Sequence, residues 1–304
     1  MLDDLERRTR RCQSGEELTT CFFVSDLHGR PGHYQKLISR IADEHPQVVF
    51  LGGDILPSGI GAFSRSNVTY QDFVHDYLVP EFTRLRDSMV DLYPRVFIIL
   101  GNDDGRSEET AILNAAAQGI WEYVHNQKAA LGDHTVYGYA CVPPTPFLLK
   151  DWERYDVSRY VDPGCVSLED GWRTMPTSEH EWKYATIQQD LDGLAAGESL
   201  ERAVFLFHTP PYNTHLDRTA RDGKKIDHVP LDVHVGSIAV RRFIESRQPW
   251  ITLHGHIHES ARLTGFWKDH IGRTHMFSAA HDGPELALVR FSLENPENAT
   301  RELI

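Results

Sequence analysis

Five short polar clusters in the sequence combine carboxylate, amide and imidazole side chains without a thiol. Each cluster comes directly after a run of apolar residues, so its polar groups stand at the end of a predicted strand. Oxygen and nitrogen donors of this kind suit divalent ions such as manganese, iron or zinc. One histidine or aspartate at a strand end is ordinary, but five such clusters in order indicate a metal centre. The clusters are Asp26-Leu27-His28, Gly53-Asp54, Gly101-Asn102-Asp103-Asp104, His208, and Gly255-His256-Ile257-His258.

The apolar runs before these clusters are rich in β-branched and aromatic residues and lack polar alternation. This pattern is typical of strands that are buried on both faces. The runs cover residues 21–24, 48–51, 96–100, 203–207 and 250–253.

Helical patterns lie between the apolar runs. Apolar residues repeat on one helical face over residues 34–41 and again over 184–194, and Ser237 is placed to cap a helix over 238–244. Alternating strands and helices predict an α/β fold with crossover connections. In such folds ligands bind at the carboxyl ends of the strands, where the five clusters stand.

The rest of the chain departs from this repeating unit. Residues 258–264, 272–279 and 285–292 are expected to be short strands of an antiparallel sheet. No repeat or linker divides the chain, so we expect one domain over 1–304 with insertions near 56–93, 143–180 and 212–236. The first 18 residues are expected to form a frayed or amphipathic helical arm.

Composition narrows the class of partner. The 304 residues include 44 acidic and 31 basic side chains, a formal net charge of −13, and 17 histidines. Hydrophobic residues at 40% and charged residues at 25% exclude a disordered or fibrous chain. The acidic balance argues against long nucleic acids as partners, but not against a small phosphorylated substrate, because a site can carry its own local charge.

The sequence also indicates in which cellular compartment the protein is expected. No run of about 18 apolar residues predicts a membrane span. Four cysteines without a CxxC pair, and a charged N-terminus without an apolar signal core, favour a cytoplasmic protein. The sequence leaves open whether the chain forms a homo-oligomer.

The combined pattern D-x-H, G-D, G-N-x-D, H and G-H-x-H, which runs from Ser25 to His258, resembles the calcineurin-like metallophosphoesterase superfamily. The resemblance implies a four-layer α/β/β/α sandwich with mixed sheets and two metal ions at the sheet edge. It also implies the ligands: Asp26, His28 and His258 for one ion, Asn102, His208 and His256 for the other, and Asp54 as the bridge.

The activity implied by the resemblance is that of a dinuclear metal-dependent phosphohydrolase, with manganese favoured over iron or zinc. Two ions ~3.5–4 Å apart would hold a phosphate and lower the pKa of a shared water to near ~7, so that hydroxide attacks phosphorus. The expected substrate is a small phosphodiester or nucleotide phosphate. The alternative is a non-catalytic binding scaffold, like the retromer subunit that resembles this superfamily. This sequence keeps every ligand, which favours the enzyme.

The sequence departs from the family pattern at Asp103, where many members carry a histidine that protonates the leaving group. An ionised carboxylate cannot donate a proton, so phosphodiesters with good leaving groups are expected over alkyl phosphomonoesters. Asp103 could be protonated if buried beside Asp104, or it could face away from the site. Asp103, Asp104 and His254 are the candidate catalytic residues. Alternatively, Asp104 orients a neighbour and His254 packs beside the site without chemistry.

Four residues are candidates for substrate contact: Arg30, Tyr212, Asn213 and His215. Arg30 follows the first cluster, and the other three follow His208. The loop that holds His215 also contains four cations, which could grip a phosphate or could simply be solvated: Arg218, Arg221, Lys224 and Lys225. The aromatic residues of the 143–180 insertion could stack a base or pack over the core, namely Trp152, Tyr155, Tyr160 and Trp172.

Overall fold

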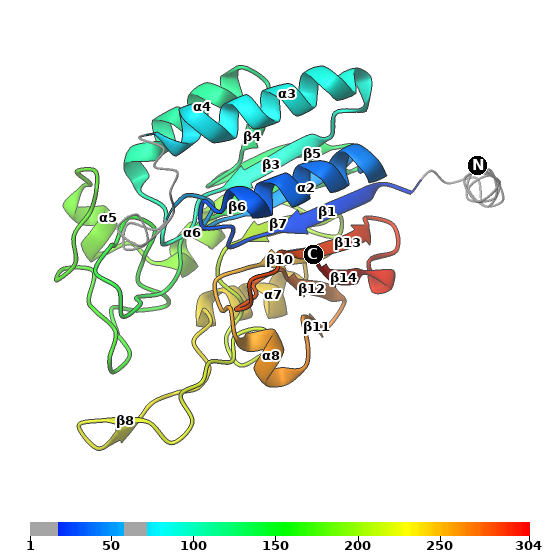
Figure 1. Ribbon diagram of the computed structural model, residues 1–304. Coiled ribbons are helices and arrows are strands. Elements are labelled where there is room, and N and C mark those ends of the chain that lie inside the picture. The colour runs from blue at the N-terminus through cyan, green and yellow to red at the C-terminus, as the bar shows by residue number, and fades with distance from the viewer. Residues whose placement is uncertain (1–17, 58–71) are drawn as a thin grey trace.

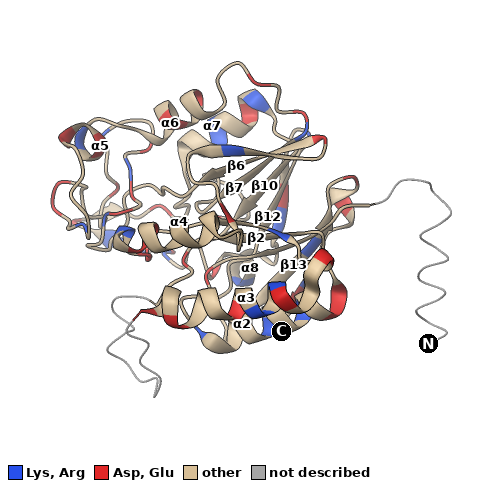
Figure 2. Cartoon of the chain, turned by 90° about the horizontal axis from the view of Figure 1, so that it is seen from above, with Lys and Arg blue, Asp and Glu red and all other residues tan. Residues whose placement is uncertain are grey.

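The fold is an α/β/β/α sandwich. The computed structural model describes residues 18–57 and 72–304. In this part of the chain two six-stranded sheets pack face to face, and helices cover their outer sides (Figures 1 and 2). Figure 2 shows α2 and α3 on one side of the sheets and α6 and α7 on the other. The four-layer fold with mixed sheets that the family resemblance implies is therefore confirmed.

The first sheet has the strand order β14-β13-β1-β2-β3-β4. Strands β1 to β4 run parallel to one another, and β13 pairs antiparallel with both β1 and β14. The strands are β1 Thr20–Val24, β2 Val48–Gly52, β3 Arg95–Ile99, β4 Glu122–Tyr123, β13 Ala287–Ser292 and β14 Thr300–Leu303.

The second sheet has the order β11-β12-β10-β7-β6-β5 and is also mixed. Four parallel strands, β6, β7, β10 and β12, form its centre, and β5 and β11 are antiparallel edges. Its strands are β5 Gln127–Leu131, β6 His134–Tyr139, β7 Ala203–Phe207, β10 Ile251–His254, β11 Lys268–Ile271 and β12 Thr274–Ser278. A separate hairpin joins β8 Lys225–Ile226 to β9 Val229–Pro230.

The helices begin where the sequence supplies caps. Pro31 opens α2, and Thr186 forms a capping box with Gln189 at the start of α6. Ser237 caps α7 by accepting a hydrogen bond from the backbone N–H of Val240, as the sequence predicts. The α-helices are α2 Pro31–Glu44, α3 Val79–Met89, α4 Glu109–Ala117, α5 Glu179–Lys183, α6 Ile187–Leu194, α7 Ile238–Arg247 and α8 Ser260–Thr264. Short turns of other helix types are η2 Val74–Leu78, η3 Val90–Leu92, η4 Arg106–Glu108 and η5 Pro296–Asn298.

The core lies between and around the two sheets. Every residue of β2 and β7 is buried, which confirms the prediction of strands covered on both faces. Phe277 of β12 and Phe291 of β13 meet across the sheets with their ring centroids 5.4 Å apart. Each fully buried phenylalanine contributes about 2–3 kcal/mol of transfer free energy. This packing fixes the strand ends that carry the polar clusters.

In the C-terminal part of the chain, the strands predicted over 272–279 and 285–292 are confirmed as β12 and β13, but the strand predicted over 258–264 is wrong. Residues 260–264 form the helix α8 instead of a strand, and the helix ends at Gly265, whose φ of 79° suits a left-handed C-cap. The tail also forms no antiparallel sheet of its own within the described residues. Strand β12 lies parallel to β10 in the second sheet, and β13 and β14 extend the first sheet.

The first of the three expected insertions is largely helical where it is described, whereas the other two contain only short elements, α5 at the end of the second and the β8–β9 hairpin in the third. The first includes η2 and α3, and its residues 58–71 lie outside the described part, as does the predicted N-terminal arm over 1–17. In the second, Trp152 and Tyr155 are buried in support of the fold, whereas Tyr160 and Trp172 are exposed. The helix predicted over 184–194 begins only at Ile187, and Tyr184 is exposed before it.

Candidate metal centre

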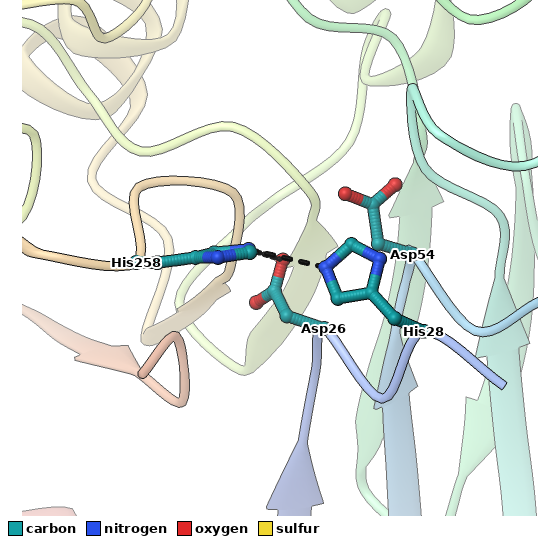
Figure 3. Close-up of side chains that lie close together, drawn as sticks. All are labelled: Asp26, His28, Asp54 and His258. Atoms are coloured by element: carbon teal, nitrogen blue, oxygen red, sulfur yellow. Dashed lines mark hydrogen bonds and ion pairs between the residues drawn. The ribbon is translucent and has the colours of Figure 1, made fainter. Parts of the chain in front are cut away.

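The two sheets bring the polar clusters together at the carboxyl ends of their parallel strands. Each sheet contains four parallel strands, and the carboxyl ends of the two sets lie on the same side of the sandwich, so residues far apart in sequence become neighbours. Figure 3 shows four of these side chains pointing toward one another. By element, Asp26 and His28 follow β1, Asp54 follows β2, Asn102 follows β3, His208 follows β7, and His256 and His258 follow β10.

The side chains form two groups that share one carboxylate. In each group the potential ligand atoms lie within 4.8 Å of one another. One group contains Asp26, His28, Asp54 and His258, and the other contains Asp54, His208 and His256. Asn102 joins the second group, because its Oδ1 lies 3.1 Å from Nε2 of His208.

The first group has the donor geometry that a cation requires. Nε2 of His28 and Nε2 of His258 face each other at 3.3 Å, and Oδ1 of Asp26 lies 3.2 Å from the same nitrogen of His258 (Figure 3). Two imidazole nitrogens at this distance can share at most one proton, which leaves a lone pair directed at the same space. Converging lone pairs beside carboxylates fit a divalent ion.

In the second group, a backbone carbonyl orients the imidazole of His208. Nδ1 of the fully buried His208 lies 2.8 Å from the carbonyl oxygen of Gly52, which can only accept a hydrogen bond. His208 therefore carries its proton on Nδ1 and directs Nε2 at Asp54, whose Oδ2 lies 3.2 Å away. This tautomer is the one that presents a ligand nitrogen to a metal ion.

Four of these residues have a left-handed backbone, in which non-glycine residues are uncommon. The φ angles are 58° at Asp26, 47° at His28, 50° at Asp54 and 72° at His256. Each such residue costs on the order of 1 kcal/mol or more, and such residues cluster at functional sites. Hydrogen bonds from the backbone N–H of Asp26 to the carbonyl of Gly53, and of His28 to the carbonyl of Asp54, hold the first two turns against each other.

Glycine is required where the strands approach most closely. A Cβ atom at Gly101 would lie 2.3 Å from Oδ1 of Asp54 and 2.8 Å from Nε2 of His208. Gly53 has a φ of 93°, and a Cβ atom there would lie 2.6 Å from Nδ1 of His208. Both positions thus leave the space into which the buried carboxylate and imidazole project.

The electrostatics of the cluster are those of carboxylates balanced by imidazolium groups. Burial lowers the pKa of His208, but Asp54 and Asp26 outweigh it and raise the pKa to about 9. Burial raises the pKa of Asp54, but His208 and His28 outweigh it and hold that pKa far below its usual range. Burial and the charge of His208 lower the pKa of His256 to about 3. Metal ions would compete with the protons of this cluster, so binding should release protons.

For Asp104 and His254, the structure favours the alternative in which both residues support the site without taking part in the chemistry. Both side chains are fully buried. Asp104 accepts hydrogen bonds from the backbone N–H groups of Ile55, Leu56 and Gly101, so it fixes the turn after β2 against the turn after β3. Nδ1 of His254 contacts the carbonyl of Thr209 at 2.9 Å, and its Nε2 contacts a hydroxyl on its own strand. Neither group lines the cavity beside the cluster.

Asp103 matches neither of the two arrangements left open by the sequence. Its side chain is 31% exposed, so it is not buried beside Asp104 as the first alternative requires. It also does not face away from the site, because its Oδ2 lies 3.2 Å from Nδ1 of His28. Its backbone N–H donates to Oδ1 of Asp54 at 2.8 Å.

Of the four predicted substrate contacts, the structure places only Arg30 beside the cluster. Arg30 lines a cavity of about 110 Å³ together with Asp26, His28 and His258. Sequence reasoning missed His33 and His281 on the same wall, because one lies within a helix and the other on the loop after β12. Neither histidine belongs to one of the five polar clusters, so no sequence pattern marked them as part of the site.

The other three predicted contacts do not line this cavity. The hydroxyl of Tyr212 donates to Asp232, and the backbone N–H of Asn213 donates to Asp217. His215 pairs with Asp269 and borders a different, larger groove of about 630 Å³. The cations of the same loop are also absent from the cavity wall in the described residues.

Comparison of the sequence with known protein families gives one match. The sequence profile of the calcineurin-like phosphoesterase family matches residues 20–260. No curated protein matches the chain significantly by sequence.

No helix in the described part of the chain is long and apolar enough to cross a membrane.

Solved structures resemble the chain in fold at low sequence identity. The protein TT1561 of Thermus thermophilus is 15% identical with a TM-score of 0.53, over 94% of this chain and 99% of that one. A dimetal phosphatase from Danio rerio is 14% identical with a TM-score of 0.50, over 95% of this chain and 96% of that one. A further crystal structure is 17% identical with a TM-score of 0.58, over 94% and 99% of the two chains. The profile match covers most of the sequence, and the chain belongs to the calcineurin-like phosphoesterase family.

Proposed function

We propose that this protein is a dinuclear metal-dependent phosphohydrolase that acts on small phosphodiesters or nucleotide phosphates. The observation that carries the proposal is that Asp54 belongs to two groups of potential ligands at once. A carboxylate shared in this way can bridge two ions, and a pair of ions is the arrangement that many phosphoester hydrolases use.

The ligand assignment follows from the two groups. Asp26, His28 and His258 would hold one ion and Asn102, His208 and His256 the other, with Asp54 between them. All are oxygen or imidazole donors, so manganese, iron and zinc fit the set, and we favour manganese. When bound, two such ions supply Lewis-acid polarisation of a phosphoryl group and a lowered pKa for an attacking water.

The chain itself would bind and orient the phosphate. The exposed Arg30 lines the cavity beside Asp26, His28 and His258, where its guanidinium can donate two parallel hydrogen bonds to phosphate oxygens. The cavity of about 110 Å³ suits a phosphoryl group and leaves the larger organic part of the substrate outside. Long nucleic acids remain disfavoured by the net charge of −13.

The preference for good leaving groups rests on position 103. The carboxylate of Asp103 contacts the Nδ1 edge of His28, where it serves as an acceptor. It therefore supplies no proton to a leaving alkoxide, and general acid catalysis by such a proton is worth ~10²–10⁴-fold in rate. We propose that phosphodiesters and nucleotide phosphates react faster than alkyl phosphomonoesters.

The test is turnover of bis-p-nitrophenyl phosphate by metal-free protein to which manganese, zinc or iron is returned. We expect manganese-dependent hydrolysis and slower hydrolysis of glycerol phosphate. Asp54→Asn and His208→Ala should each lose more than ~100-fold, because loss of even a ligand's hydrogen-bond partner costs ~10–100-fold. Asp133→Asn is the matched control, since Asp133 is exposed and pairs with Arg202 away from the cluster. Metal binding without turnover of any phosphate ester would favour a binding scaffold.

A further inference from the structure

We propose that Asp103 is a positioning residue of the metal centre, whose carboxylate holds Nδ1 of His28 so that Nε2 is presented to a metal ion. The proposal rests on the proposed function in one respect only, that the group containing Asp26, His28 and His258 binds an ion. It gives position 103 a role in metal binding in place of proton donation.

The geometry separates the two nitrogens of His28. Oδ2 of Asp103 lies 3.2 Å from Nδ1, on one edge of the ring. Nε2, on the other edge, lies 3.3 Å from Nε2 of His258 (Figure 3). A neutral imidazole carries one N–H, so an acceptor at Nδ1 selects the tautomer whose lone pair is on Nε2. Carboxylate partners of this kind also fix the ring orientation of a metal ligand.

His28 needs this support more than His208 does. His208 is fully buried, and the carbonyl of Gly52 at the end of β2 fixes its Nδ1. His28 instead lies on a turn with a φ of 47°, and its side chain is 15% exposed. The same function, an acceptor at Nδ1, is thus supplied by the backbone in one ligand group and by Asp103 in the other.

Asp103 also contacts the shared carboxylate, but through its backbone. Its N–H donates to Oδ1 of Asp54 at 2.8 Å. Substitution of the side chain keeps this bond and removes the contact with His28. Because the side chain is 31% exposed, its removal opens no cavity in the core. Side-chain variants therefore separate the positioning role from folding and from the bridge.

The first measurement is binding of Mn²⁺ alone to the metal-free full-length protein by equilibrium dialysis. We expect two ions per chain in the wild type. Asp103→Ala should weaken one of the two by ~10–100-fold and leave the other nearly unchanged. Asp103→Asn, whose amide oxygen can still accept, should fall between. Asp72→Asn is the matched control, because it removes a carboxylate from Nδ1 of the exposed His75, at 2.7 Å, outside the cluster.

The second measurement reads the tautomer directly. In Zn²⁺-loaded protein with ¹⁵N-labelled histidine, the Nδ1–H signal of His28 should be present in the wild type and lost in Asp103→Ala. The proposal is overturned if the wild type binds two ions and Asp103→Ala binds both with unchanged affinity. That result would leave the proposed function intact. A wild type that binds no metal ion would instead overturn the proposed function and this inference together.

Discussion

Gly101 stands between β3 and Asn102 at the point where the two ligand groups meet, and a side chain there has no room. A Cβ atom would lie 2.3 Å from Oδ1 of Asp54, 2.4 Å from its backbone nitrogen and 2.8 Å from Nε2 of His208. Ordinary contact begins near 3.4 Å, so Asp54 would have to move by about 1.1 Å. A rotamer change of Asp54 cannot relieve the clash, because the new Cβ atom also overlaps the backbone nitrogen of Asp54.

The expected effect of Gly101→Ala follows from this displacement. A misplacement of about 1 Å at a reacting centre costs on the order of 100-fold in rate. Overpacking of a dense interior costs about 1–3 kcal/mol in the free energy of unfolding. In a chain of 304 residues that corresponds to a fall in Tm of roughly 1.5–2 °C per kcal/mol. The variant should therefore stay folded while it loses activity and bound metal.

The assay compares metal content, phosphodiester turnover and Tm in Gly101→Ala and in Gly193→Ala. Gly193 lies in α6, and a Cβ atom there would meet no atom within 4 Å, so the control should be neutral or slightly stabilising. If Gly101→Ala kept wild-type activity and two bound ions, the close approach of β3 to the shared carboxylate would not matter, and our description of the site would be wrong.

Two further predictions concern groups away from the cluster. Lys150 and Glu153 form a fully buried ion pair at 2.6 Å, so Lys150→Met should lower the free energy of unfolding by about 3–5 kcal/mol, and adding Glu153→Gln should restore most of the loss. Urea denaturation measures both variants, and a double variant whose loss is the sum of the two single losses would contradict the pairing. Burial, with Arg154 and Arg106 nearby, lowers the pKa of His125 to about 3, whereas the unfolded chain titrates near its ordinary value of 6.5. The unfolded state therefore binds the proton first, and stability should fall as pH drops below 6.5, by up to about 1.4 kcal/mol per pH unit from this residue. His125→Gln, which keeps an acceptor for the N–H of Ala140, should reduce this slope by up to about 1.4 kcal/mol per pH unit between about pH 6.5 and 5, and an unchanged slope would show that His125 is not responsible.

The clustering of candidate ligands was predictable from sequence because it depends on local patterns. Each apolar run marks a strand, and each polar cluster starts where the strand ends, so the parallel topology brings Asp26, Asp54 and His208 together. The short helix α8 was not predictable in the same way. Its five residues are too few to show a helical period, and Gly265 is the single local signal for its end.

The direction in which side chains near the site point could not be predicted from the sequence. Asp103 and Asp104 are adjacent, yet one reaches His28 and the other accepts three backbone hydrogen bonds from two turns. Tyr212 and His215 follow the candidate ligand His208 closely, but they pair with carboxylates elsewhere in the chain, Asp232 and Asp269. These choices depend on partners that only the folded chain brings near.

The central claim is that Asp54 is shared by two metal ions. A crystal structure of manganese-loaded protein, with anomalous scattering recorded at the manganese edge, tests it most directly. Our account predicts two anomalous peaks, one on each side of the Asp54 carboxylate, with Asp26, His28 and His258 around the first and Asn102, His208 and His256 around the second. A single peak, or two peaks that do not share Asp54, would contradict it.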